Sequence, residues 1–159
     1  MRVIACDPVR DDEFAKQHGI EWREFEDLFI EGDFVSLHIP LTEQTRRCVN
    51  WDHLSQMKKT AFLINTARGP IVNEQDLHDA LREQELAGAG LDVFEQEPPV
   101  NSPLLSLPNV IVTAHTAGID TRSRDDMALL AAKNLVAAWQ GNAPAEFLVN
   151  ANVKQGAKG

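Results

Sequence analysis

Three side chains of different chemical type stand out because together they can bind an acid and transfer a proton. Arg68 offers a planar fork of N–H donors that matches a carboxylate. His115 carries an imidazole, which titrates near neutral pH and can act as a general acid or base. Two prolines fix the chain after Glu97, whose carboxylate can hydrogen-bond an imidazole and favour its protonated form. Taken singly, each is equally an ordinary residue: a solvent-facing arginine, an acidic surface loop, or a histidine bonded to backbone.

An anion clamp, a carboxylate and an imidazole in one crevice form a coherent catalytic set. The imidazolium can give a proton to a carbonyl oxygen while another group supplies a hydride. No side chain donates a hydride, so this chemistry requires a nicotinamide cofactor. A metal centre is not expected, because no two histidines have the spacing of a ligand pair such as H-E-x-x-H. We expect His18, His53 and His78 on helix surfaces, in contact with water.

The elements that must position these residues alternate along the chain. Short apolar runs predict strands over residues 3–6, 20–25, 34–39, 61–65, 88–91 and 109–113. Amphipathic segments predict helices over residues 11–18, 26–31, 50–57, 73–86 and 120–140, with Asn50 and Asn73 as N-caps and Gly19 as a stop. This alternation predicts an α/β fold with a parallel sheet covered on both faces. The carboxyl ends of such strands share one edge, where ligands bind.

Composition restricts the partners that the protein can have. The chain has 159 residues, of which 43% are hydrophobic, as in a globular domain. Its 24 acidic and 15 basic residues give a net charge of −9, which argues against a nucleic acid or an anionic membrane as partner. Cys6 and Cys48 form no C-x-x-C motif, and no apolar run approaches the ~18 residues of a membrane span. We therefore expect a cytoplasmic location.

Four segments in order carry a resemblance to a known family. They are DFVSLHIPLTEQT (33–45), LINTARGPIVNE (63–74), LAGAGLDVFEQEP (86–98) and LPNVIVTAHTAG (107–118). Over residues 2–150 the chain resembles the D-isomer-specific 2-hydroxyacid dehydrogenases, and most of all their phosphoglycerate dehydrogenase branch. The family pattern has proline at the position of Ala114. Alanine restricts the backbone less than proline does, so the backbone before His115 is freer in this chain.

The resemblance implies a role for each matching residue. Arg68 would bind the substrate carboxylate and keto oxygen, His115 would be the acid/base, and Glu97 its carboxylate partner. Asp7 would hold the adenosine ribose of NAD, although taken alone it is more often a turn aspartate before Pro8. The residues implied to contact NAD are Asp7, Pro8, His38, Ile39, Pro40, Thr45, Thr66, Ala67, Arg68, Asp92, His115, Ala117 and Gly118.

The glycine-rich turn of such folds does not occur in the sequence. No G-x-G-x-x-G is found, although in the family this turn follows the first strand and cradles the pyrophosphate. We therefore expect a partial Rossmann-like, doubly wound parallel sheet that lacks the first strand. Residues 1–150 would be the C-terminal portion of a dinucleotide-binding domain and residues 151–159 a frayed tail, with the substrate domain absent.

The expected gap lies at the centre of the sheet. In the strand order 3-2-1-4-5-6, strand 1 separates the strands expected over residues 3–6 and 34–39. Unpaired strand edges associate readily. We therefore expect one of three outcomes: direct pairing across the gap, a homodimer that fills it, or disorder over residues 1–30.

Together the residues and the resemblance predict an NAD-dependent oxidoreductase. It would interconvert a 2-hydroxy acid (phosphoglycerate, glycerate or similar) and its 2-keto acid, with this stretch of chain weak or inactive alone. The alternatives are a dinucleotide-sensing protein-interaction module of the corepressor type, or a decayed or truncated reading frame without function. The sequence does not say which 2-hydroxy acid is used.

Overall fold

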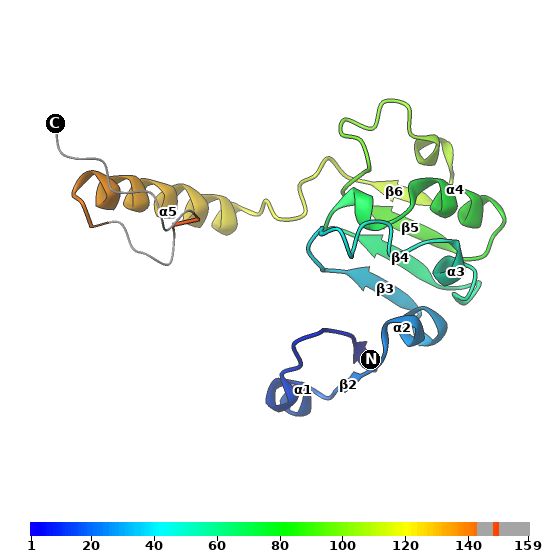
Figure 1. The fold of residues 1–159 in the computed structure, drawn as a ribbon. Helices are drawn as coiled ribbons and strands as arrows, with labels where there is room; N and C mark the ends of the chain where they lie inside the picture. The colour runs from blue at the N-terminus through cyan, green and yellow to red at the C-terminus, as the bar shows by residue number, and fades with distance from the viewer. Residues whose placement is uncertain (143–147, 150–159) are drawn as a thin grey trace. The chain divides into compact units, whose positions relative to one another are not determined.

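The computed structural model describes residues 1–142 and 148–149, and the chain divides into two compact units. The first unit, Met1–Thr116, contains β1 (Val3–Ala5), α1 (Asp12–His18), β2 (Ile20–Trp22), α2 (Phe25–Glu31), β3 (Phe34–Leu37), α3 (Trp51–Leu54), β4 (Phe62–Asn65), α4 (Glu74–Arg82), β5 (Gly88–Leu91) and β6 (Val110–Val112) (Figure 1). Two 3-10 turns, Gly69–Ile71 and Pro103–Ser106, precede α4 and β6. The second unit contains α5 (Thr121–Trp139). The predicted alternation of strands and helices is confirmed, and the tail expected over residues 151–159 lies outside the described residues.

Helix ends lie where the capping residues predict them. The side chain of Asn50 accepts a hydrogen bond from the Asp52 N–H, and that of Asn73 accepts one from the Asp76 N–H. Each satisfies a backbone donor that has no partner within its helix. α1 ends at Gly19, whose φ of 65° lies in the left-handed region that glycine adopts without a steric penalty.

The strands form two separate parallel sheets. β3, β4, β5 and β6 follow one another in that order, and β1 pairs with β2 alone. The expected direct pairing of the first strand with β3 is therefore wrong. The expected disorder over residues 1–30 is also wrong, because this segment forms β1, α1, β2 and most of α2. A homodimer that fills the gap stays a prediction.

Ion pairs link β1, β2 and α2. Arg2 contacts both Glu21 and Glu31 at 2.9 Å, while Arg23 contacts Glu21 at 2.6 Å and Glu31 at 2.9 Å. Hydrogen bonds from the two guanidinium groups lower the pKa of Glu21 to about 2 and also lower the pKa of Glu31. These contacts join β2 to α2 within residues 1–31. Their contribution to stability is present above pH 4.5 and is lost as the pH falls toward 2.

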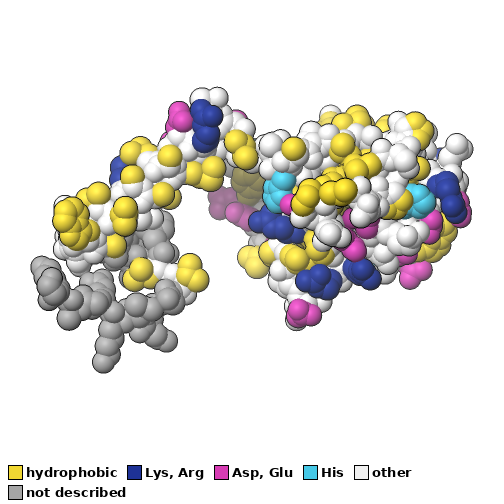
Figure 2. Space-filling view, turned by 90° about the horizontal axis from the view of Figure 1, so that it is seen from above, with side chains coloured by type: hydrophobic (Ala, Val, Ile, Leu, Met, Phe, Trp, Pro, Cys, Tyr) yellow, Lys and Arg dark blue, Asp and Glu magenta, His cyan; other side chains and the backbone are white. Residues whose placement is uncertain are grey.

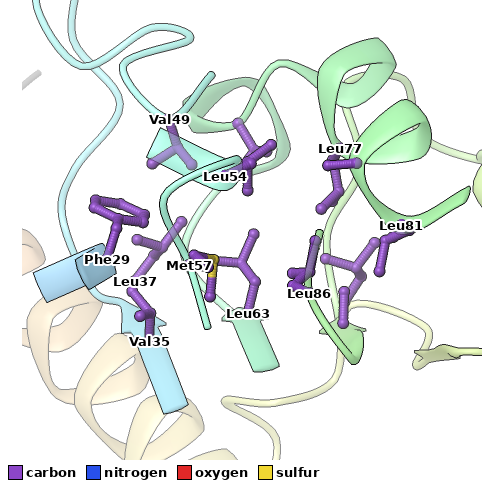
Figure 3. Close-up of a cluster of buried hydrophobic side chains, with 14 of the residues drawn as sticks. Phe29, Val35, Leu37, Val49, Leu54, Met57, Leu63, Leu77, Leu81 and Leu86 are labelled. Carbon is purple, nitrogen blue, oxygen red and sulfur yellow. The ribbon is translucent and has the colours of Figure 1, made fainter. Parts of the chain in front are cut away.

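The core lies on one face of the four-stranded sheet. Leu63 of β4 packs with Leu54 of α3 and with Leu77 and Leu81 of α4, and all four are buried (Figure 3). Successive strands advance in one direction across the sheet, and right-handed crossovers then place α3 and α4 on the same side.

The opposite face of this sheet is bare within the first unit. Strand register places Phe34 beside Phe62 on this face, and their rings stack with centroids 5.4 Å apart. Ile111 lies on the same face through its pairing with Gly90 and is 75% exposed. The expectation of a sheet covered on both faces is therefore wrong for this unit, since both crossover helices lie on the other side.

α5 begins at Asp120, whose carboxylate accepts hydrogen bonds from the backbone N–H groups of Arg122 and Ser123. Met127 and Leu135 of this helix are exposed. Figure 2 shows further hydrophobic side chains on the surface of α5. Within residues 1–142 and 148–149, no helix is both long and apolar enough to cross a bilayer.

Replacement of Leu63 by alanine should destabilise the first unit. The side chain is fully buried, and a cavity at such a site costs about 2–5 kcal/mol of unfolding free energy. Ile111→Ala on the bare face is the matched control and should change stability by no more than about 0.5 kcal/mol. Urea denaturation followed by circular dichroism measures both. Equal losses in the two variants would show that the face carrying Ile111 is covered in solution.

Candidate active site

Four loops meet at one edge of the sheet because β3, β4, β5 and β6 run parallel. Their strand ends at Leu37, Asn65, Leu91 and Val112 lie at the same edge, so the residues that follow them gather there. The predicted site residues His38, Thr66–Arg68, Asp92 and His115 all stand in these loops. The expectation that they share one edge is confirmed.

Asn65 shapes the loop after β4. Its side chain is 1% exposed, its Oδ1 accepts a hydrogen bond from the Ala67 N–H, and its Nδ2 donates to the Arg68 carbonyl, both at 3.0 Å. These two bonds close a tight turn that presents Thr66 and Arg68 at the sheet edge. The sequence prediction did not assign this role. The available signal was a lone amide at the end of an otherwise apolar strand.

A cavity of about 540 Å³ lies between the loops that follow β3 and β4. It is lined by His38, Ile39, Pro40, Leu41, Thr66, Ala67 and Arg68. The structure thus brings together six residues that the resemblance assigned to NAD. The lining is an open mixture of apolar side chains and polar groups. Such a mixture can take a flat heteroaromatic ring with its ribose, so these residues fit the nicotinamide end of a dinucleotide.

Thr45 stabilises the loop after β3, which lines part of this cavity. Its hydroxyl donates to the Pro40 carbonyl at 2.6 Å and accepts from the Thr42 N–H at 2.7 Å. The side chain is therefore engaged within its own loop and does not line the cavity. Arg68 is exposed at the rim, and its Nη1 donates to the Ala67 carbonyl at 2.6 Å.

Asp92 anchors the loop that carries His115. It is 4% exposed, and its Oδ1 accepts hydrogen bonds from the Thr113 hydroxyl and, at 2.8 Å, from the Thr116 N–H. These two donors flank His115, whose φ of 56° lies in the left-handed region. Such a conformation costs a non-glycine residue about 1–3 kcal/mol, which the bonds to Asp92 offset. Contact of Asp92 with NAD stays a prediction.

His115 and Glu97 form a close pair. The imidazole Nδ1 lies 2.7 Å from Glu97 Oε2, while Glu97 Oε1 accepts a hydrogen bond from the Phe94 N–H at 3.1 Å. The bond from His115 lowers the pKa of Glu97, so the carboxylate is ionised near neutral pH. An ionised carboxylate only accepts hydrogen bonds, and Nδ1 must therefore carry a proton. The ring is half exposed, so Nε2 is the nitrogen available to a reacting group.

A second cavity, of about 410 Å³, lies beside this pair. It is lined by Asp92, Phe94, Glu97, Pro98, Pro99, Leu105, Val112, Thr113, Ala114 and His115. Arg68 lines the first cavity and not this one. The structure joins Glu97 with His115 in one cavity as predicted but places Arg68 in another at the same edge. The reason is that each cavity forms between neighbouring strand ends, β3 with β4 and β5 with β6.

The remaining predicted cofactor residues are Asp7, Pro8, Ala117 and Gly118. Asp7 and Pro8 follow β1 and are exposed, and Asp7 Oδ1 accepts a hydrogen bond from the Val9 N–H at 2.7 Å. Neither residue lines either cavity. Ala117 and Gly118 belong to the second unit, so their contact with a cofactor stays a prediction.

Two histidines expected to face water are partly buried instead. The His53 ring lies 5.3 Å from that of Phe25 and 5.0 Å from that of Phe29, and its Nδ1 contacts Asn50 Oδ1. His78 contacts Asp79 and has a side chain that is 15% exposed. Across the described part of the chain, no cluster of three His, Cys, Asp or Glu side chains is placed to hold a metal ion.

Gly69 allows the loops after β4 and β5 to touch. A Cβ atom at this position would lie 1.9 Å from the carbonyl carbon of Phe94 and 2.6 Å from the backbone nitrogen of Glu95. Both neighbours are backbone atoms, so a side chain here forces the two loops apart. Arg68 directly precedes the contact and Glu97 follows it by two residues. The contact therefore sets the spacing between the loops that carry the two cavities.

Comparisons with known proteins bear on this arrangement. The sequence profile of the family described as "D-isomer specific 2-hydroxyacid dehydrogenase, NAD binding domain" matches residues 1–117. A glyoxylate reductase of Korarchaeum cryptofilum is 46% identical over 154 residues, which cover 96% of this chain and 46% of that protein. A glyoxylate reductase of Thermococcus kodakarensis is 44% identical over 153 residues, with the same coverage. The chain thus spans about half the length of the curated relatives it matches.

Solved structures show the same fold. The D-lactate dehydrogenase of Lactobacillus jensenii with NAD+ has a TM-score of 0.83 and 31% identity, covering 93% of this chain and 48% of that one. A glyoxylate reductase from Paecilomyes thermophila has a TM-score of 0.78 and 31% identity, covering 87% of this chain and 42% of that one. These likenesses support the Rossmann-like architecture expected from the sequence.

Substitution of Gly69 by alanine should separate the loops after β4 and β5. The clash with the Phe94 backbone should cost about 1–3 kcal/mol of unfolding free energy, as overpacking does. In the matched control, Gly90→Ala, the new Cβ meets only the flexible end of Ile64 at 3.1 Å and should cost far less. Thermal melts of the two variants compare them, and equal melting temperatures would refute the close approach.

Removal of the His115 imidazole should raise the pKa of Glu97 toward its ordinary value. The hydrogen bond from His115 is the largest cause of the lowered pKa, so His115→Ala removes it. The pair stabilises the fold above pH 4.5, and the wild type loses this contribution as the pH falls through the lowered pKa. Carbon-13 NMR titration of the Glu97 carboxyl measures the change. His18→Ala should leave it unaltered, and an unaltered Glu97 pKa in His115→Ala would contradict the pairing.

Proposed function

Because the chain belongs to the D-isomer specific 2-hydroxyacid dehydrogenase NAD binding domain family, we propose that it takes part in hydride transfer between NADH and a small 2-keto acid. The observation that carries this proposal is the 2.7 Å contact between His115 Nδ1 and Glu97 Oε2. It orients an imidazole whose Nε2 can exchange a proton with a substrate oxygen.

The proposed substrate is glyoxylate or a 2-keto acid of similar size. The similar relatives named above are glyoxylate reductases, and this favours glyoxylate over the phosphorylated keto acid that the branch expected from the sequence would use. Arg68 supports an acid substrate, because an exposed guanidinium at the sheet edge can pair with a carboxylate through two hydrogen bonds. The homodimer and the cytoplasmic location expected from the sequence remain predictions.

The first cavity is the proposed binding site of the nicotinamide. His38, Ile39, Pro40, Thr66 and Ala67 would hold it, between apolar side chains and polar groups. When bound, the cofactor supplies the hydride that no side chain can provide.

The proposed proton donor is His115, which lines the second cavity. His115 Nε2 donates a proton to the keto oxygen as negative charge develops there, and it recovers that proton in the reverse direction. Glu97 accepts the hydrogen bond from Nδ1 and so keeps the proton on that nitrogen. Asp92 holds the loop on both sides of His115, so the ring keeps its orientation through the reaction. In sum, a 2-keto acid, NADH and a proton give a 2-hydroxy acid and NAD+.

Oxidation of NADH by glyoxylate, followed at 340 nm, tests the assignment of His115. His115→Ala should lower kcat at least about 100-fold, the usual loss for a missing general acid. His78→Ala is the matched control and should keep wild-type turnover. Hydroxypyruvate and phosphohydroxypyruvate in parallel reactions test the substrate choice.

Two results would overturn the proposal. One is equal turnover by the wild type and His115→Ala, which would remove the imidazole from the chemistry. The other is the absence of NADH binding by the wild type, which would remove the source of the hydride.

A further inference from the structure

A two-point ion pair joins two loops that are distant in sequence. Arg47 Nε contacts Glu95 Oε1 and Arg47 Nη2 contacts Glu95 Oε2, both at 3.0 Å, across 48 residues of chain. Such a bidentate contact fixes the orientation of both partners, which a single contact does not. Neither residue was singled out by the sequence prediction, and neither has a part in the chemistry proposed above.

The backbone of Arg47 is itself held in place. Its N–H donates to the Pro70 carbonyl at 2.8 Å, and the next residue but one, Val49, donates to the Ile71 carbonyl at 3.1 Å. Arg47 also has a φ of 52°, an uncommon conformation for a residue with a side chain. The guanidinium therefore extends from a backbone that is bonded to the segment directly after Arg68.

Glu95 is held on its other side by α4. Its backbone N–H donates to Glu74 Oε2 at 3.0 Å, and Glu74 Oε1 accepts a hydrogen bond from the Ser102 hydroxyl. The residue before Glu95 is Phe94, whose N–H binds Glu97 Oε1. The short turn from Phe94 to Glu97 is thus held by Arg47 through a side chain and by Glu74 through the backbone.

We propose that Arg47 is a positioning residue that, through Glu95, holds the turn of residues 94–97 so that Glu97 meets His115. The expected effect of Arg47 on turnover rests on the proposed function. Arg47 lies in the loop that also carries Pro40 and Leu41 of the first cavity, whereas Glu97 and His115 line the second. The ion pair therefore links the loop that lines the first cavity to the turn that carries Glu97 of the second cavity.

The exposure of the pair argues for positioning over fold stability. The side chains are 57% and 26% exposed, and ion pairs in contact with water contribute little to the free energy of unfolding. The causes of the lowered Glu97 pKa are the bonds from His115 and Phe94. Loss of the Arg47 charge should therefore reach Glu97 mainly through a change in geometry.

The test is Arg47→Met, which keeps the apolar stem and removes the guanidinium. The pKa of Glu97, measured by carbon-13 NMR titration, should rise toward 4.5 because the turn no longer holds Glu97 against His115. In the NADH-dependent reaction with glyoxylate, kcat should fall about 10-fold or more, with KM changed less than about 2-fold. The melting temperature should fall by no more than about 3 °C.

Three further variants make the result specific. Arg46→Met, at the neighbouring exposed arginine, should leave the pKa of Glu97 and kcat at wild-type values. Arg47→Lys offers a single donor point and should give an intermediate effect. The double variant Arg47→Glu with Glu95→Arg rebuilds an ion pair and should restore the Glu97 pKa.

An unchanged Glu97 pKa in folded Arg47→Met would overturn the proposal. If Arg47→Met does not fold, the double variant decides: a restored Glu97 pKa supports positioning, and a folded double variant with a raised Glu97 pKa refutes it. A wild type that does not bind NADH would overturn the proposed function, whereas the pKa comparison would still decide for or against Arg47.

Discussion

The parallel pairing of four strands is the constraint on which the site depends. Because β3, β4, β5 and β6 run in one direction, each delivers its following loop to the same edge. A buried polar side chain then shapes two of these loops: Asn65 closes the turn before Arg68, and Asp92 holds both sides of His115. Backbone direction thus brings the functional groups together, and side-chain hydrogen bonds orient them.

Contacts between loops complete the arrangement. Gly69 lets the loop after β4 lie directly against Phe94, and the ion pair of Arg47 with Glu95 bridges the loop after β3 to the same turn. Glu97 leaves that turn and meets His115. The carboxylate–imidazole pair therefore depends on four loops at once, those after β3, β4, β5 and β6, which explains how a half-exposed pair can have a defined geometry.

The sequence predicts the local elements well because capping and periodicity are local properties. Asn50, Asn73 and Gly19 mark helix ends that the structure confirms. It predicts the sheet only in part, because pairing depends on which strands are present: β1 pairs with β2 alone, and one face of the larger sheet is bare. Long-range contacts such as that of Arg47 with Glu95, across 48 residues, leave no periodic or spacing signal in a single sequence.

The central claim is that a 2-keto acid reaches the imidazole nitrogen of His115 that Glu97 leaves available. Long-range proton–nitrogen NMR of the five histidines tests this directly when NADH and oxamate, an unreactive 2-keto acid analogue, are added. The Nε2 resonance of His115 and the ring resonances of His38 should shift. The ring resonances of His18, His53 and His78 should not. An unchanged His115 spectrum at saturating NADH and oxamate would contradict this claim.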